Sequence, residues 1–297
     1  MKADDIYERV TAQLVRQLET ASANDWQRPW FTMATEGPRN AETERPYRGM
    51  NAWAFAVADA ATTPHWGSFK MWLRLGYVVR TGEHAEHGIY WKATTKTRRG
   101  GTLRDLEAGE RPGLVPFGFA VFNFSQVEPL DGFDGTRWEP PAPMVRTDHE
   151  RHAAAEAMFA RAGADVRHAP GRAFYSPAGD YLSVPDLSDF RDAEGYYATL
   201  AHEHGHWTGH PSRLARDMSG RFGSAAYAME ELVAEMAAAF MCASVGVSAT
   251  PRRDHASYLA SWLQVLRSDH RAVYTAAKAA QSAADYVIGT TAHAAAA

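Results

Sequence analysis

The chain has 297 residues, of which 45% are hydrophobic and 22% are charged, as in an ordinary globular protein. Its net charge of −4 excludes a strongly basic protein, and its single cysteine excludes an internal disulfide bond. The uncharged, mostly apolar run over residues 236–247 is too short to cross a bilayer, and the acidic N-terminal residues do not resemble a secretory signal. We therefore expect a cytoplasmic protein with no membrane partner, long enough for two domains.

The first half mixes helical and strand patterns. Apolar residues recur at helical spacing over residues 3–21, which predicts an amphipathic helix, followed by a loop-like stretch to about residue 50. We expect short helices near residues 50–60 and 66–75, strands at 77–79, 88–92 and 117–127, and a loop over 96–113. Residues 1–128 are thus predicted to form a mixed α/β domain.

The second half is predicted to be mainly helical. Residues 129–145 are rich in proline and are expected to link the first domain to a second one, residues 146–290. Within it we expect a helix over 149–162, a small hairpin over 173–184, and helices near 188–208, 224–245, 252–268 and 270–288, with a frayed tail beyond. The predicted fold class is therefore α+β, with a small sheet in the helical domain.

The strongest local signal is the segment His202-Glu203-His204-Gly205-His206. Two histidines four residues apart on a helix differ by about 40° in azimuth and about 6 Å in rise, so both rings can reach one ion. Glu203 lies one step round the helix, where it can take a proton from a water on that ion. We therefore predict His202 and His206 as ligands of one divalent ion, expected to be zinc, and Glu203 as the catalytic base.

Three candidates compete for the place of the third ligand. His210 lies about 12 Å beyond His202 on a continuous helix, which is too far to reach the same ion, and the metzincin motif fails because Ser212 stands where it requires its third histidine. A downstream helix carrying an acidic ligand is the gluzincin alternative, and Glu231 and Glu235 share one face of the predicted helix over 224–245. We predict Glu231 as the ligand and Glu235 as the carboxylate that orients a histidine, and we expect Glu230 to lie off that face. His204 lies on the opposite side of its helix and is predicted to be structural or exposed.

Short segments along both halves of the chain carry a family resemblance. They are residues 201–214, 219–223 and 230–235 in the second half and, in the first half, Asn40, Thr43, residues 47–51, Trp66, Phe69, Lys70, Gly82, Glu83 and residues 121–123. In these segments the second half resembles the ArdC family of plasmid antirestriction proteins, and the first half resembles the N-terminal domain that ArdC shares with TraC-type plasmid primases. His204 departs from the family pattern, which usually has an apolar residue there.

The resemblance implies a first domain that binds single-stranded DNA and a second domain that is a zincin-like metallopeptidase. It also implies a role in protecting plasmid DNA from host restriction during conjugation, and it leaves a protein substrate unidentified. Two alternatives from other classes stay open. One is a DNA-binding protein with a structural, non-catalytic metal that protects DNA sterically, and the other is a regulatory metalloprotease localised on DNA.

The first half has side chains suited to single-stranded DNA. Residues 26–127 hold 13 basic and 9 acidic residues, and single-strand binders combine basic grooves with aromatic faces. We predict Arg48 and Lys70 as phosphate contacts, Tyr47 and Trp66 as stacking residues, and Asn51 as a further DNA contact. The alternatives are that these aromatics are core and that Asn51 holds a loop. The full basic and aromatic set is Arg28, Arg39, Arg45, Arg48, Lys70, Arg74, Arg80, Lys92 and Lys96 with Trp30, Tyr47, Trp66, Trp72 and Tyr90.

Overall fold

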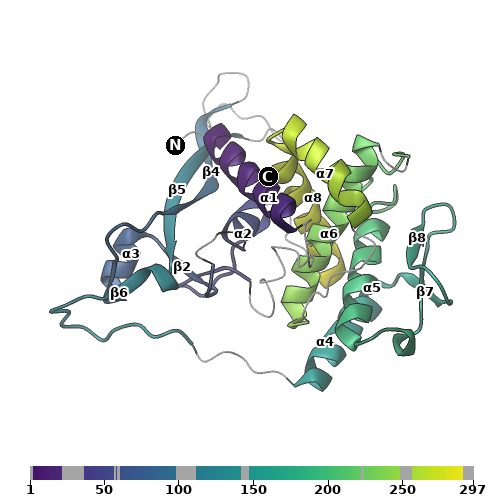
Figure 1. Cartoon of the computed structure of the whole chain (residues 1–297), viewed down its shortest axis with the longest axis horizontal. Helices are drawn as coiled ribbons and strands as arrows, with labels where there is room; N and C mark the ends of the chain where they lie inside the picture. Colours follow the sequence, from purple (N-terminus) through teal and green to yellow (C-terminus); the bar gives the residue numbers. More distant parts are fainter. Residues whose placement is uncertain are drawn as a thin grey trace.

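The computed structural model describes residues 3–21, 37–56, 58, 61–97, 112–141, 147–221, 224–247 and 256–289. It shows an α+β protein with a mixed first half and a mainly helical second half that carries a small sheet (Figure 1). Arg28, Trp30, most of the loop predicted over 96–113 and the C-terminal tail lie outside the described residues. No helix in these ranges is long and apolar enough to cross a membrane.

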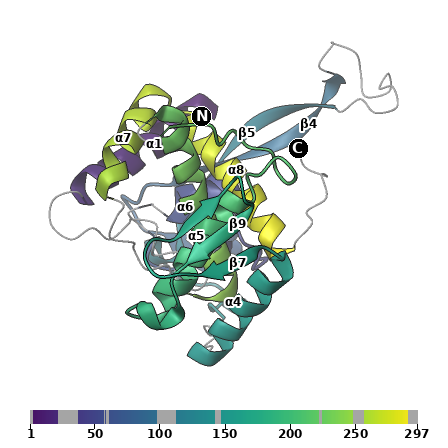
Figure 2. The ribbon, with the colours of Figure 1, turned by 90° about the vertical axis from the view of Figure 1, so that its right-hand side faces the viewer.

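A four-stranded sheet organises the first half. β1 runs parallel to β2, which pairs antiparallel with β5, and β5 pairs antiparallel with β4 along a ribbon that projects from the body of the protein (Figure 2). A second small sheet pairs β3 with β6. The elements are α1 (Ala3–Ala21), β1 (Arg39–Asn40), α2 (Gly49–Ala56), β2 (His65–Gly67), α3 (Phe69–Arg74), β3 (Tyr77–Val79), β4 (Glu86–Thr97), β5 (Pro112–Asn123) and β6 (Val127–Pro129).

The helix predicted over 66–75 is partly wrong. Trp66 belongs to β2, where it pairs with Asn123 of β5, and α3 begins only after Ser68, whose side chain accepts a hydrogen bond from the backbone N–H of Met71. The helix predicted to residue 60 ends at Ala56, and the strand predicted to residue 127 ends at Asn123, whose side chain caps a short 3-10 turn. Strands of two or three residues are too short to show a period of two in the sequence.

The second half is built from helices around one small sheet. The predicted helix over 149–162 and the hairpin over 173–184 are confirmed, and Gly163 ends the helix in the left-handed conformation, with φ of 76°. The sheet gains a parallel strand, β7, that the sequence pattern does not reveal. The elements are α4 (Asp148–Ala162), β7 (Asp165–His168), β8 (Phe174–Ser176), β9 (Tyr181–Val184), α5 (Ala193–Trp207), α6 (Ala225–Val245), α7 (Ala256–Ser268) and α8 (Ala272–Ile288).

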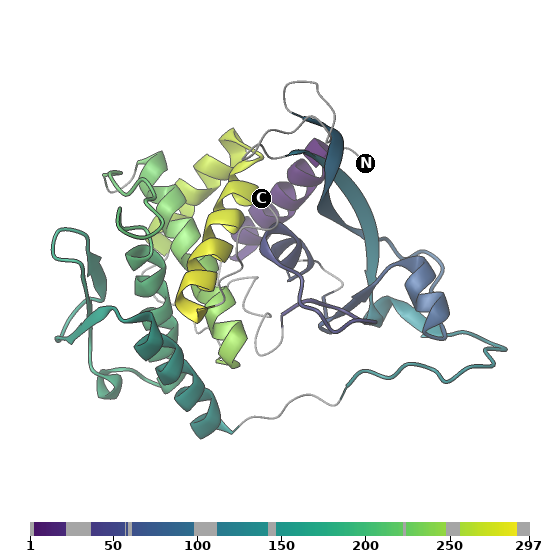
Figure 3. The same cartoon turned by 180° about the vertical axis from the view of Figure 1, so that it is seen from behind.

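The two halves share one hydrophobic core. α1 and α2 pack against helices of the second half, with the Tyr7 ring 5.0 Å from the Tyr274 ring and the Trp53 ring 6.1 Å from the Phe240 ring. Beyond β6 the described residues 130–141 run back toward α4, which lies on the other side of the molecule (Figure 3). These residues are held to the first half, where the Tyr77 hydroxyl donates to the Trp138 carbonyl at 2.8 Å. The predicted limits of two domains remain a prediction.

Candidate metal centre

Helix α5 places the two predicted histidine ligands inside the second half. Asp192 caps its N-terminus by accepting a hydrogen bond from the Gly195 N–H at 2.8 Å, and the helix then runs to Trp207 with most of its residues buried. Because α5 is surrounded by other elements, polar groups on it need partners from neighbouring helices. The main such neighbour is α6.

A glycine lets α5 and α6 approach closely. A Cβ atom added to Gly205 would lie 2.9 Å from the Cα of Ala234, closer than real Cβ contacts allow. The backbones therefore pack almost directly on each other at this point, between the two histidines of α5 and the acidic stretch of α6. This contact brings the first turns of α6 against the C-terminal half of α5.

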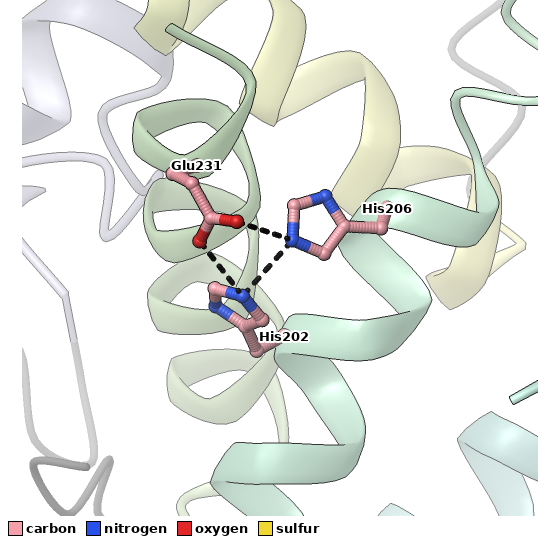
Figure 4. A group of neighbouring side chains, drawn as sticks. All are labelled: His202, His206 and Glu231. Carbon is pink, nitrogen blue, oxygen red and sulfur yellow. Dashed lines mark hydrogen bonds and ion pairs between the residues drawn. The ribbon is translucent and has the colours of Figure 1, made fainter. Parts of the chain in front are cut away.

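The structure brings His202, His206 and Glu231 together, with one donor atom from each within 4.8 Å of the others (Figure 4). The two Nε2 atoms lie 3.0 Å apart, and the Glu231 carboxylate oxygens lie 3.5 Å from His202 Nε2 and 3.6 Å from His206 Nε2. Ligands about 2.1 Å from a tetrahedral zinc ion are separated by about 3.4 Å. The three residues therefore fit one small divalent ion.

Each histidine is also held from behind by a second carboxylate. His202 Nδ1 lies 2.9 Å from Glu235 Oε1, and His206 Nδ1 lies 3.2 Å from Glu230 Oε1. Such contacts fix the ring orientation and leave Nε2 free to face the ion. The sequence predicted this role for Glu235 but placed Glu230 off the face, and the structure corrects that placement.

Arg216 fixes the position of Glu230. Its guanidinium donates to both carboxylate oxygens of Glu230, at 2.9 and 2.7 Å, and also to the Gly205 carbonyl at 2.6 Å and the Thr208 hydroxyl at 2.8 Å. A buried bidentate pair of this kind is rigid because both partners are planar. Arg216 lies in the loop between α5 and α6, and no pattern in the sequence identifies it.

The site is electrostatically prepared for a cation. Burial alone would lower the pKa of His206, but the neighbouring carboxylates of Glu230, Glu231 and Glu203 raise it to about 9. Burial would likewise raise the pKa of Glu231, but hydrogen bonding to His202 and the charge of His206 hold it well below 4.5. Carboxylates that stabilise a proton on His206 would also stabilise a divalent cation beside it.

The other residues of the motif take distinct places on α5. Glu203 is buried, and its charge acts on His206. His204 is buried on another side, where its Nδ1 bonds the Leu200 carbonyl and its ring packs 4.6 Å from that of Phe159. His210 lies past the end of α5 and bonds Ser212, and it does not join the group of three.

Two of the predicted DNA contacts are better explained by roles in the fold. Trp66 is 0% exposed and packs against Phe55 at 5.1 Å, so its predicted stacking on bases is wrong, because no face of the ring is accessible. The side chain of Asn51 forms two hydrogen bonds with the backbone of Ile89 in β4. Its NH2 group donates to the carbonyl at 2.7 Å, and its oxygen accepts from the N–H at 2.8 Å. Asn51 therefore joins α2 to β4 and does not hold a loop as its alternative interpretation predicted, and the structure does not support a DNA contact.

The other three predicted DNA contacts lie nearer the surface. Tyr47 is half-buried against Phe55 and Phe119. Arg48 is exposed but forms a close ion pair with Asp285 of α8, and Lys70 is exposed at the start of α3. The structure does not gather these residues into one site, and their contact with DNA remains a prediction.

Comparisons with known proteins agree with the two-part reading of the chain. Residues 4–122 match the family described as the N-terminal domain of anti-restriction factor ArdC, and residues 153–279 match a family of zincin-like metallopeptidases. The uncharacterized protein y4eC of Sinorhizobium fredii is 42% identical over 95% of this chain and 91% of its own length. A DNA primase TraC of Escherichia coli is 35% identical over 95% of this chain, which spans only 27% of that larger protein.

Solved structures give the same family. The metal-free crystal structure of the antirestriction protein ArdC from the R388 plasmid has a TM-score of 0.71 and 32% identity, covering 95% of this chain and 96% of that one. Its Mn(II)-bound structure also has a TM-score of 0.71, with 30% identity over 97% and 98% of the two chains. Since the likeness spans both chains almost entirely, this protein belongs to the ArdC family of antirestriction proteins.

Proposed function

We propose that this protein acts in the cytoplasm during conjugation, where it binds incoming single-stranded plasmid DNA through its first half and protects it from host restriction. The centre on α5 and α6 is a peptide-hydrolysing site. DNA binding is supported by the match of residues 4–122 to the ArdC N-terminal domain and by the likeness to TraC primases. Peptide hydrolysis is supported by the convergence of His202, His206 and Glu231 beside Glu203.

The residues of the centre divide into two roles. His202, His206 and Glu231 hold the ion, and two imidazoles with one carboxylate favour zinc, although a relative has been solved with Mn(II). A divalent ion held there would act as a Lewis acid and make a coordinated water acidic. Glu203 takes the proton of the attacking water and delivers it to the leaving amine, which is the work of a general base followed by a general acid.

A structural metal is the second candidate for this centre, and one observation favours it. His202, Glu203, Glu231 and Glu235 are all buried, which suits a closed site more than one open to a peptide. In that case the protein would protect DNA sterically, and Glu203 would be dispensable. Only the first candidate, a peptide-hydrolysing site, requires a protein substrate, and that substrate is unidentified.

A plasmid-transfer assay into a restricting host separates the two candidates. It compares the wild type, Glu203→Gln and His206→Ala, each expressed in the recipient at equal level. Loss of protection by both variants supports a hydrolytic role, and loss by His206→Ala alone supports a structural metal. If the wild type gives no more transfer than an empty vector, the proposed antirestriction role is wrong.

A further inference from the structure

The β4–β5 ribbon carries an exposed aromatic face. Tyr90 of β4 is 39% exposed and Phe117 of β5 is 43% exposed, although both are large apolar rings. They are direct partners in the antiparallel register, so the two side chains stand on the same side of the ribbon. Val115, two residues before Phe117, is exposed on the same side and extends the apolar area.

The two rings form a platform with a cation above it. Their centroids are 5.7 Å apart and their planes differ by 25°, which is a stacked arrangement. The Lys92 ammonium lies 5.4 Å from each ring centroid. Because Lys92 follows Tyr90 by two residues, its side chain projects from the same face and adds positive charge to an aromatic surface.

The platform is fixed to the core by further rings. Phe119 lies 6.0 Å from Tyr90 and 6.2 Å from Tyr47, and Tyr47 in turn packs on Phe55. Gly88 makes room for this row, since a Cβ there would lie 2.3 Å from the Phe119 ring. Rings supported in this way lose little conformational freedom when a ligand stacks on them.

We propose that the face formed by Tyr90, Phe117 and Lys92 is where this protein stacks the bases of single-stranded DNA. The inference rests on the DNA binding proposed above and gives it a location. Every base offers a flat π-face, so exposed rings bind single strands with little sequence preference, and the ammonium of Lys92 attracts the phosphates between the bases. A duplex hides its base faces and would bind the platform poorly. A second copy of this chain is the competing occupant, and the test below separates it.

The test measures binding of a fluorescent single-stranded oligonucleotide to the full chain by anisotropy. Phe117→Ala and Tyr90→Ala should each weaken binding by roughly 5- to 100-fold, as loss of one stacked base predicts. Phe174→Ala is the matched control, because Phe174 is also on a strand and 40% exposed but lies in the second half. Tyr90→Phe keeps the ring and should bind within about twofold of the wild type.

An oligonucleotide with abasic sites identifies stacking as the cause. The wild type should bind this oligonucleotide more weakly than an intact one. Phe117→Ala should bind the two oligonucleotides nearly equally, because it lacks the ring on which the base stacks. If the wild type does not bind single strands at all, the proposed DNA binding fails together with this inference. If the wild type binds and both alanine variants bind equally well, only the platform is wrong. Unchanged binding with altered sedimentation of Phe117→Ala would assign the face to a contact between copies of the chain.

Discussion

The centre on α5 and α6 and the platform on β4 and β5 are built in opposite ways. In the centre most side chains are buried, and each histidine contacts a second carboxylate: Glu235 lies against His202, and Glu230, paired with Arg216, lies against His206. On the platform the rings are exposed, and other rings beneath hold them in place. The difference suits the ligands we assign. An ion needs a few donor atoms fixed to within tenths of an ångström, whereas a stacked base needs only a flat, supported surface.

The largest effect that we expect is on peptide hydrolysis, and it tests whether the centre and the platform act separately. Glu203→Gln should lower the rate of peptide hydrolysis by about a hundred- to ten-thousandfold, because the amide cannot take the proton that the carboxylate accepts. The same change should leave DNA affinity within about twofold, because no platform residue contacts it. The measurement is hydrolysis of a quenched fluorescent peptide library by equal amounts of both proteins. Equal rates in the two proteins would assign the centre a structural role.

The next effect separates core rings from platform rings. Trp66→Ala should lower the free energy of unfolding by about 3–5 kcal/mol, since it empties a fully buried site. Phe117→Ala should cost less than about 1 kcal/mol, because its ring is exposed in the folded protein. Urea denaturation followed by fluorescence gives both values. A stable Trp66→Ala protein with weakened DNA binding would restore Trp66 as a stacking residue.

A smaller effect concerns the groups behind the histidines. Glu230→Gln, Glu235→Gln and Arg216→Gln should each weaken metal affinity by about 10- to 100-fold, because the rings lose the contacts that orient them. Arg167→Gln is the matched control, since Arg167 is exposed and pairs only with the nearby Asp165 among the described carboxylates. Titration against a competing chelator gives the affinities. If the metal affinity is unchanged in both Glu230→Gln and Arg216→Gln, these two residues do not orient the metal ligands.

The smallest effect that we expect is on the free energy of unfolding, from substitution of His204 on the side of α5 that faces away from the metal ligands. Nε2 of His204 is buried with no hydrogen-bond partner among the described protein groups, and burial lowers the pKa of this histidine to about 4. His204→Leu should therefore raise the free energy of unfolding by about 1 kcal/mol and leave metal binding intact. His204→Ala should instead destabilise the protein, because it removes the packing on Phe159. Thermal denaturation compares the three proteins, and destabilisation by His204→Leu would show that its polar atoms have a role.

The grouping of the two candidate histidine ligands was predictable because helix geometry is local. Two histidines four residues apart on one helix must share a face, and that alone brings His202 and His206 together. Glu231 required the gluzincin pattern, since nothing in local geometry says which acidic face of α6 meets α5. Glu230 was misplaced because its contact depends on Arg216 and on the close approach at Gly205, and both are tertiary features.

The first half was harder to predict for a physical reason. Trp66 and Phe117 are both aromatic residues in apolar surroundings, and the sequence does not say which one the tertiary fold covers. Trp66 lies in a three-residue strand at the centre of a sheet, whereas Phe117 lies on a projecting ribbon. Tyr90 and Lys92 were among the basic and aromatic candidates, but only the strand register shows that they and Phe117 share one face.

Metal content of the purified protein tests the central claim most directly. We predict about one divalent ion per chain in the wild type and in Glu203→Gln, and none in His206→Ala or Glu231→Ala, with the helical circular dichroism signal unchanged in all four. Elemental analysis after dialysis against a weak chelator gives the result. Full metal content in His206→Ala would contradict the assignment of His202, His206 and Glu231 as one metal centre.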